Sequence, residues 1–201
     1  MDDVADHWVR LEDTPRSRWK NGLGLTRELM AGPGSHDWDW RLSIAEIDRD
    51  ADYSPFPGCA RWQWLLAGDG LDLDGPGTRQ SLCKPFQCIR FDGGMPVRAR
   101  LSGGPVRVLN LIWWPCLVTP STRVRRLRPG AGVRIARQDP VLVHALAGQV
   151  RIRGALGTDA HAPGQGDTLL LVPRQDGAAA SVCGDGTVLL VRLQPVSGVR
   201  G

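Results

Sequence analysis

The chain has 201 residues, a formal net charge of +4 and 42% hydrophobic residues, and it contains no apolar run of about 18 residues that would span a membrane. Its 25 glycines and 15 prolines are scattered, which is typical of many short strands joined by turns. Five cysteines without a Cys-x-x-Cys motif, and an acidic start without an apolar signal segment, lead us to expect a cytoplasmic protein without disulfides.

The first informative segment is Ser17–Glu28, which combines a tryptophan, several cations, an amide and glycines. Cations and amides supply hydrogen-bond donors, and glycine allows a ligand to approach the backbone closely. Trp19 would form an apolar wall, and Lys20 and Asn21 would contact the ligand. The alternative is an N-terminal hairpin in which Trp19 fills the core and Lys20 is solvated.

The next segment, Asp39–Ile47, is predicted to be a strand. Arg41 and Ser43 are two residues apart and therefore share one face of it. An arginine inside a β-barrel needs an anionic partner. That partner is either a carboxylate ligand, which arginine grips with two hydrogen bonds, or an internal acid. The candidate internal acids are Glu28, Asp39 and Glu46.

Further polar residues of the first half, Arg27, Arg61 and Asn110, extend this constellation. The second half has no comparable set, so we place the binding function in the first half. We predict no catalytic residue. The expected ligand-binding residues are Trp19, Lys20, Asn21, Arg41, Ser43 and Arg61.

The chain repeats itself with an offset of 80 residues. Leu66–Gly70 resembles Leu146–Val150, with Gly68 matching Gly148, and Val108–Leu111 corresponds to Val188–Val191. Fixed-period self-similarity indicates duplicated architecture. We therefore predict an all-β protein made of two double-stranded β-helix (jelly-roll) barrels, with an N-terminal barrel over residues 1–119 and a C-terminal barrel over 120–201.

Residues 98–153 hold eleven arginines and a single acid, Asp139. The arginines alternate with apolar residues, as in Val97–Leu101 and Val150–Arg153, and this period of two is typical of the outer face of half-buried strands. Nucleic acid is therefore disfavoured as a partner. A surface that faces a second subunit remains open, and so does a homodimer.

The four histidines, His7, His36, His144 and His161, are far apart in sequence, and none has a second ligand at metal-binding spacing. A two-histidine, one-carboxylate site would have to assemble from distant strands. A lone histidine on a strand is more often a satisfied core residue. We predict no metal and no other cofactor.

Taken in order, Ser17–Glu28, Asp39–Ile47, Tyr53–Gly58, Leu66–Gly70 and Leu101–Leu111 resemble the HutD/Ves family of bacterial bicupins, part of the RmlC-like cupin superfamily. The resemblance runs from about Arg18 to Trp113. Two positions depart from the family pattern. Leu23 stands where the family usually has a glycine, and Trp113–Cys116 replaces a basic segment.

The resemblance implies a non-enzymatic regulatory or sensor protein tied to histidine utilisation, with N-formylglutamate or a similar small carboxylate as ligand. Two alternatives stay open. One is a metal-free isomerase or lyase that uses Lys20 or Glu46 as general acid or base in the same pocket. The other is an interaction protein that docks an acidic partner through its arginine-rich second half. A membrane partner is not expected.

Overall fold

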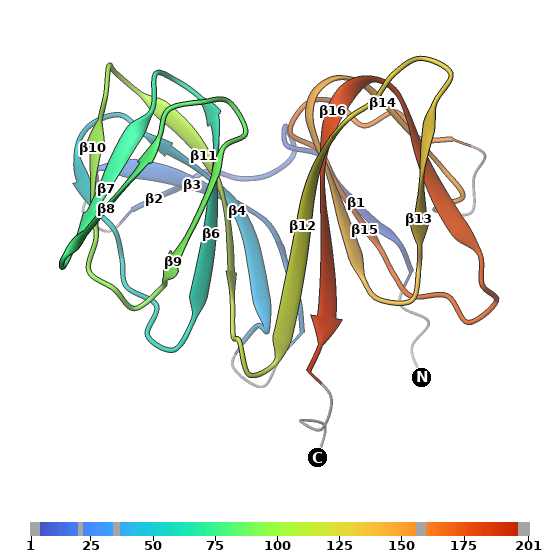
Figure 1. The fold of residues 1–201 in the computed structure, drawn as a ribbon, viewed down its shortest axis with the longest axis horizontal. Helices are drawn as coiled ribbons and strands as arrows, with labels where there is room; N and C mark the ends of the chain where they lie inside the picture. The colour runs from blue at the N-terminus through green and yellow to red at the C-terminus, as the bar shows by residue number, and fades with distance from the viewer. Residues whose placement is uncertain (1–4, 20–21, 34–36, 156–159, 197–201) are drawn as a thin grey trace. The chain divides into compact units, whose positions relative to one another are not determined.

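The computed structural model describes residues 5–19, 22–33, 37–155 and 160–196, which form strands and turns without a helix (Figure 1). No helix in these ranges is therefore long and apolar enough to cross a membrane. The chain divides into two units, one of residues 14–118 and one of residues 119–201 together with residues 1–13.

The described residues 5–13 thus belong to the second unit, whereas we expected them in the first. The reason is a long-range strand pairing, because β1 (His7–Val9) runs antiparallel to β15 (Thr168–Leu171). The Trp8 indole also donates a hydrogen bond to Asp167 Oδ2 over 3.3 Å. Local sequence gives no sign of a pairing between strands about 160 residues apart.

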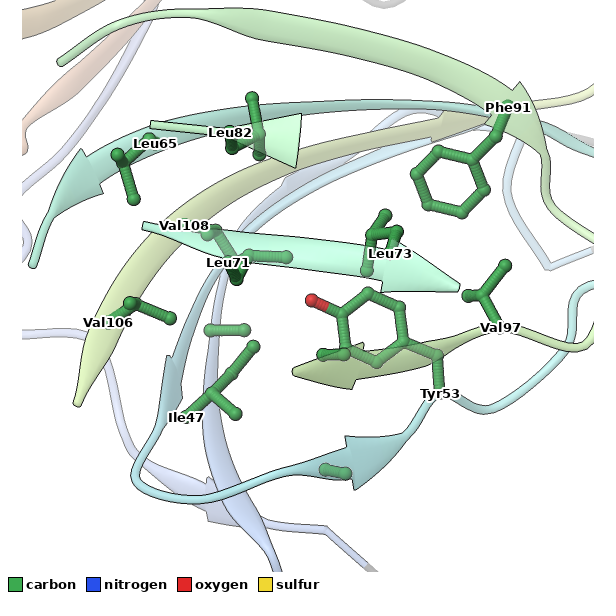
Figure 2. Packing of buried hydrophobic residues seen from close by; sticks show 13 residues of the cluster. Ile47, Tyr53, Leu65, Leu71, Leu73, Leu82, Phe91, Val97, Val106 and Val108 are labelled. Atoms are coloured by element: carbon green, nitrogen blue, oxygen red, sulfur yellow. The ribbon is translucent and has the colours of Figure 1, made fainter. Parts of the chain in front are cut away.

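The first unit contains two sheets with an apolar core formed by both (Figure 2). Leu65 and Val108 from one sheet pack with Leu71 and Leu73 from the other. The larger sheet has the order β2 (Ser17–Arg18), β3 (Gly24–Ala31), β4 (Trp40–Ile47), β11 (Val106–Trp113), β6 (Ala60–Ala67) and β9 (Cys88–Asp92). The smaller sheet has the order β5 (Ala51–Asp52), β10 (Arg98–Leu101), β7 (Leu71–Gly75) and β8 (Thr78–Leu82).

The second unit is built around two long strands, β14 (Val141–Arg153) and β16 (Ala179–Pro195), which pair antiparallel. Its sheet has the order β1, β15, β14, β16 and β12 (Val118–Arg126), and β13 (Gly132–Ala136) also pairs with β16. A separate core cluster belongs to this unit, with Val143, Leu169 and Val188 among its buried members.

The two units repeat the same strand register with the predicted offset of 80 residues. In the first unit Asn110 pairs with Gln63, and in the second Leu190 pairs with Val143. The two glycines of the repeat are equivalent as well. A Cβ at Gly68 would lie 2.5 Å from the Pro105 carbonyl oxygen, and a Cβ at Gly148 would lie 2.5 Å from that of Asp185. Both glycines have positive φ, which a side chain would strain.

The expected barrels are open. Among the described strands, none of the three sheets closes on itself through backbone hydrogen bonds. In the first unit, the edge strands β2 and β5 are only two residues long and are too short to complete a ladder between the sheets. The all-β, duplicated jelly-roll class is confirmed, but the described strands of neither unit form a continuous cylinder.

Candidate functional site

A pocket of about 220 Å³ in the first unit gathers four of the six expected binding residues, Trp19, Arg41, Ser43 and Arg61. Lys20 and Asn21 lie outside the described residues. As predicted, Arg41 and Ser43 share one face of β4. The described lining is Arg18, Trp19, Thr26, Arg41, Ser43, Ala45, Tyr53, Ser54, Phe56, Arg61, Asn110 and Ile112.

Arg61 is the buried cation of this pocket, with 6% of its surface exposed. Its Nε and Nη2 donate hydrogen bonds to Asn110 Oδ1 over 3.1 and 2.7 Å. The guanidinium carbon lies 4.5 Å from the centroid of the Tyr53 ring and 5.4 Å from that of Phe91. No carboxylate among the described residues forms an ion pair with Arg61.

Burial lowers the pKa of Arg61 to about 10, with Tyr53 opposing this shift and the nearby Arg41 adding to it. The guanidinium therefore remains charged at neutral pH. Burying an ion without a counter-charge costs several kcal/mol. The neutral oxygen of Asn110 compensates only part of that cost, so an anion that enters the pocket would find an uncompensated cation.

Asn110 holds Arg61 within a small buried network. Its Oδ1 also accepts a hydrogen bond from Gln63 Nε2 over 2.9 Å, and the same Gln63 nitrogen lies 2.9 Å from the Tyr53 hydroxyl. Burial raises the pKa of Tyr53, against the opposing effects of Arg61 and Gln63, so the phenol stays neutral. This network fixes the orientation of Arg61.

Our expected set omitted Tyr53, Gln63 and Asn110. Gln63 follows Arg61 by two residues on β6, and strand alternation alone indicates that the two share a face. Asn110 was among the polar residues of the first half but lacked a positional argument. Tyr53 follows the short strand β5, and no periodic pattern places it in the pocket.

Arg41 has an internal partner, and of the three candidate acids it is Glu28. The Arg41 Nη1 to Glu28 Oε2 distance is 3.5 Å, and 54% of the Glu28 side chain is exposed, so the pair is weak. The guanidinium also lies 5.1 Å from the Phe56 ring centroid. Arg41 Nε is buried without a hydrogen-bond partner among the described residues.

Trp19 forms one wall of the pocket. Its indole Nε1 donates a hydrogen bond to Thr26 Oγ1 over 2.7 Å, and its ring meets Tyr53 edge to face at 5.9 Å between centroids. These two contacts fix the ring position, so an apolar surface faces the cations. Trp19 therefore lines the pocket and also packs against the core of this unit, so its position agrees with both interpretations of Ser17–Glu28.

The electrostatic character of the pocket is strongly positive. Its described lining includes three arginines and no aspartate or glutamate. A larger hollow of about 450 Å³ in the same unit is lined by Glu46 and Asp48 as well as by Arg18 and Arg107, so its charges balance. Cavity size alone would favour the larger hollow, but unbalanced charge favours the Arg61 pocket for an anionic ligand.

The isomerase or lyase alternative placed Glu46 in this pocket, and that placement is wrong. Glu46 is absent from the described lining, since an even-numbered residue of β4 points away from Arg41 and Ser43, and it contacts Arg16 at 3.6 Å and Arg27 at 3.9 Å. No group of three His, Cys, Asp or Glu residues in the described ranges could hold a metal.

The comparisons with known proteins agree on one family. A family model described as HutD matches residues 11–190. An uncharacterized 21.2 kDa protein in the hutC 3' region of Pseudomonas putida is 41% identical over 111 residues, 53% of this chain and 57% of that protein. Protein Ves of Cronobacter sakazakii is 35% identical over 123 residues, 61% of this chain and 62% of that protein. These matches span about three-fifths of each curated relative.

Solved structures extend the likeness to almost the whole chain. HutD from Pseudomonas fluorescens SBW25 superposes with a TM-score of 0.81 at 30% identity, covering 96% of this chain and 100% of that chain. A cupin 2 conserved barrel domain protein from Leptotrichia buccalis shares the fold alone, with a TM-score of 0.60 at 7% identity over 94% of this chain and 96% of that chain. The chain therefore belongs to the HutD family and has the cupin fold.

Proposed function

We propose that the protein binds a small carboxylic acid in the Arg61 pocket and acts as a ligand sensor or regulator rather than as an enzyme. The observation that carries the proposal is the buried Arg61 guanidinium, which has no ion-pair partner among the described residues. A ligand carboxylate would supply the missing counter-charge and accept paired N–H donors.

The ligand class we propose is a dicarboxylate that carries an amide, with N-formylglutamate as the specific candidate. Arg61 and Arg41 would bind the two carboxylates. The hydroxyls of Thr26 and Ser43 and the amide of Asn110 would bind the formamide group. A volume of about 220 Å³ lies below the range of roughly 300–1,000 Å³ for sites that hold drug-sized ligands, so it suits a small metabolite.

A role in histidine utilisation is part of the proposal. It is supported by family membership and by the Pseudomonas putida relative, whose name places its gene beside hutC. A sensor does not consume its ligand. The described pocket offers binding groups and no carboxylate, histidine or thiol to act as a general base, which supports binding without turnover.

Isothermal calorimetry with N-formyl-L-glutamate tests this proposal on the wild type, on Arg61→Met and on the control Arg79→Gln. Arg79 is an exposed cation of the same unit, paired with Asp74 and absent from the described pocket lining. We expect Arg61→Met to weaken binding more than tenfold, because a charge-assisted hydrogen bond contributes about 1.5–3 kcal/mol. The control should bind like the wild type.

Equal affinity in wild type and Arg61→Met would reject the site. Turnover is tested separately by recording NMR spectra of N-formyl-L-glutamate during prolonged incubation with the protein. Unchanged ligand spectra are expected. Loss of the formyl or Cα signals in the presence of wild type, but not of Arg61→Met, would replace the sensor with an enzyme that uses the same pocket.

A further inference from the structure

The second unit has its own pocket, of about 420 Å³, at the place equivalent to the Arg61 pocket. The strand register establishes the equivalence. Val141 pairs with Arg192 as Arg61 pairs with Ile112, and Leu190 pairs with Val143 as Asn110 pairs with Gln63. The described lining is Ser121, Thr122, Arg123, Arg125, Val133, Arg134, Ile135, Val141, Leu190 and Arg192.

The second pocket has apolar side chains at the positions where the first pocket has a buried cation and an amide. Where the first pocket has Arg61 and Asn110, the second has the apolar side chains of Val141 and Leu190. Val141 is 3% exposed, whereas Leu190 and Val133 remain partly exposed and are therefore accessible to a ligand. The described floor of the pocket therefore offers apolar surface and carries no buried charge.

The cations of the second pocket lie on its exposed wall. Arg123 and Arg125 are two apart on β12 and share a face with Ser121, and β13 contributes the exposed Arg134. None of these three arginines forms an ion pair within the described ranges. Arg192 is held by Asp139 at 3.2 Å. No acid is present in the described lining, so cations surround an apolar floor.

We propose that the second pocket binds a monocarboxylate with an apolar body, such as an aliphatic or aromatic acid. The body would lie on Val133, Val141 and Leu190, and Arg123 and Arg125 would bind the carboxylate. A compact dicarboxylate fits less well, because one of its charges would have to be desolvated against apolar side chains. A phosphate backbone would leave the apolar floor uncovered.

An alternative explanation of these arginines needs no ligand. In the described sheet, β12 lies at one end of the strand order, and charged side chains on an edge strand prevent pairing with other chains. That explanation predicts no binding of apolar acids. It also predicts no dependence of affinity on the length of an aliphatic chain, so a series of fatty acids separates the two accounts.

The test is calorimetry of the full chain with butyrate, hexanoate and octanoate. If the body is buried on the apolar floor, each added methylene should raise affinity by up to about fourfold until the pocket is filled. The double variant Arg123→Gln/Arg125→Gln should weaken octanoate binding about tenfold. The matched control Arg151→Gln removes an exposed cation of the same unit that is not in the described lining, and it should bind octanoate normally.

Arg61→Met should leave the affinity for octanoate unchanged. The proposal for the second pocket can therefore be rejected independently of the proposal for the Arg61 pocket. Absence of octanoate binding, or equal affinity across the three acids, would overturn the proposal. The last measurement is the binding of a short single-stranded oligonucleotide at several salt concentrations. Oligonucleotide binding that falls steeply with salt and is lost in the double variant, without octanoate binding, would assign the arginines to nucleic acid instead.

Discussion

Arg61 donates two hydrogen bonds to one oxygen, Asn110 Oδ1, over 3.1 and 2.7 Å, so a neutral amide occupies the place that a carboxylate usually takes beside a buried arginine. Because Asn110 also accepts from Gln63, its oxygen is fully used, yet no described carboxylate forms an ion pair with Arg61. The second unit has apolar residues at both equivalent positions, which confines this arrangement to the first unit.

Asn110→Asp should convert the pocket from an anion site into an internal ion pair. The substitution keeps the shape of the side chain and adds a counter-charge, which no described residue supplies to Arg61. We expect N-formyl-L-glutamate binding to fall more than tenfold while the melting temperature rises at neutral pH, measured by calorimetry and thermal unfolding. Retained affinity together with a higher melting temperature would show that the charge of Arg61 is not what binds the ligand.

Two buried arginines should respond in opposite ways to the same substitution. Arg137 forms an ion pair with Asp6, and their side chains are 3% and 5% exposed. Arg137→Met removes the cation that faces the buried Asp6 carboxylate and should destabilise the fold by about 3–5 kcal/mol. Arg61→Met removes a charge that has no ion-pair partner in the described structure, so the free energy of unfolding should stay equal or increase.

Urea unfolding of the two methionine variants gives this comparison directly. Equal destabilisation by both substitutions would contradict it, because it would mean that Arg61 has an internal counter-charge after all. The comparison is matched, since both side chains are buried cations with hydrogen bonds to neutral oxygens, Asn110 Oδ1 for Arg61 and Val172 O for Arg137.

Arg41→Lys should weaken carboxylate binding although it keeps the charge. A lysine cannot make the paired, planar contact of a guanidinium, so the affinity measured by calorimetry should fall several-fold, and Arg41→Ala should abolish binding. The control is Glu28→Gln, which removes the exposed partner at 3.5 Å and should leave affinity equal or higher. If Arg41→Ala lowers only the melting temperature, Arg41 is a structural residue.

Strand alternation and the 80-residue repeat were sufficient to predict the all-β duplication and the shared face of Arg41 and Ser43. They were not sufficient for features that depend on distant pairing, such as β1 beside β15. Alternation also cannot say which face of a strand is interior. We expected the arginines of residues 98–153 on outer faces, and Arg98, Arg123 and Arg125 are indeed exposed, but Arg137 is buried.

In the candidate site, too, local features could be predicted from the sequence and features set by distant packing could not. Residue chemistry identified Arg61 and Arg41 as cations in need of anions, because that requirement is local to the side chain. It could not identify Tyr53, whose place beside Arg61 is set by packing, with 4.5 Å between the guanidinium and the ring centroid. Nor could it show that Arg137, within the arginine-rich segment, is buried against Asp6 in the second unit.

The affinity for a small carboxylate should depend on pH in a way that identifies Arg61. Burial lowers the pKa of Arg61 to about 10, whereas burial raises that of the adjacent Tyr53, so Arg61 is the group expected to titrate first in this contact. Affinity for N-formyl-L-glutamate should be flat between about pH 7 and 9. Above about pH 10 it should fall towards tenfold per pH unit, because the neutral guanidine no longer attracts the carboxylate.

The contribution of Arg61 to the free energy of unfolding should rise above about pH 10, the range in which ligand affinity falls. The folded-state pKa lies below that of the unfolded chain, so above about pH 10 the unfolded state binds more protons, and this group then adds stability as pH rises. The difference in unfolding free energy between wild type and Arg61→Met isolates the effect, since other groups titrate alike in both. Between pH 9 and pH 11, the free energy of unfolding of the wild type should rise relative to that of Arg61→Met. A constant difference, together with constant affinity, would mean that an anionic group already neutralises Arg61 in the free protein.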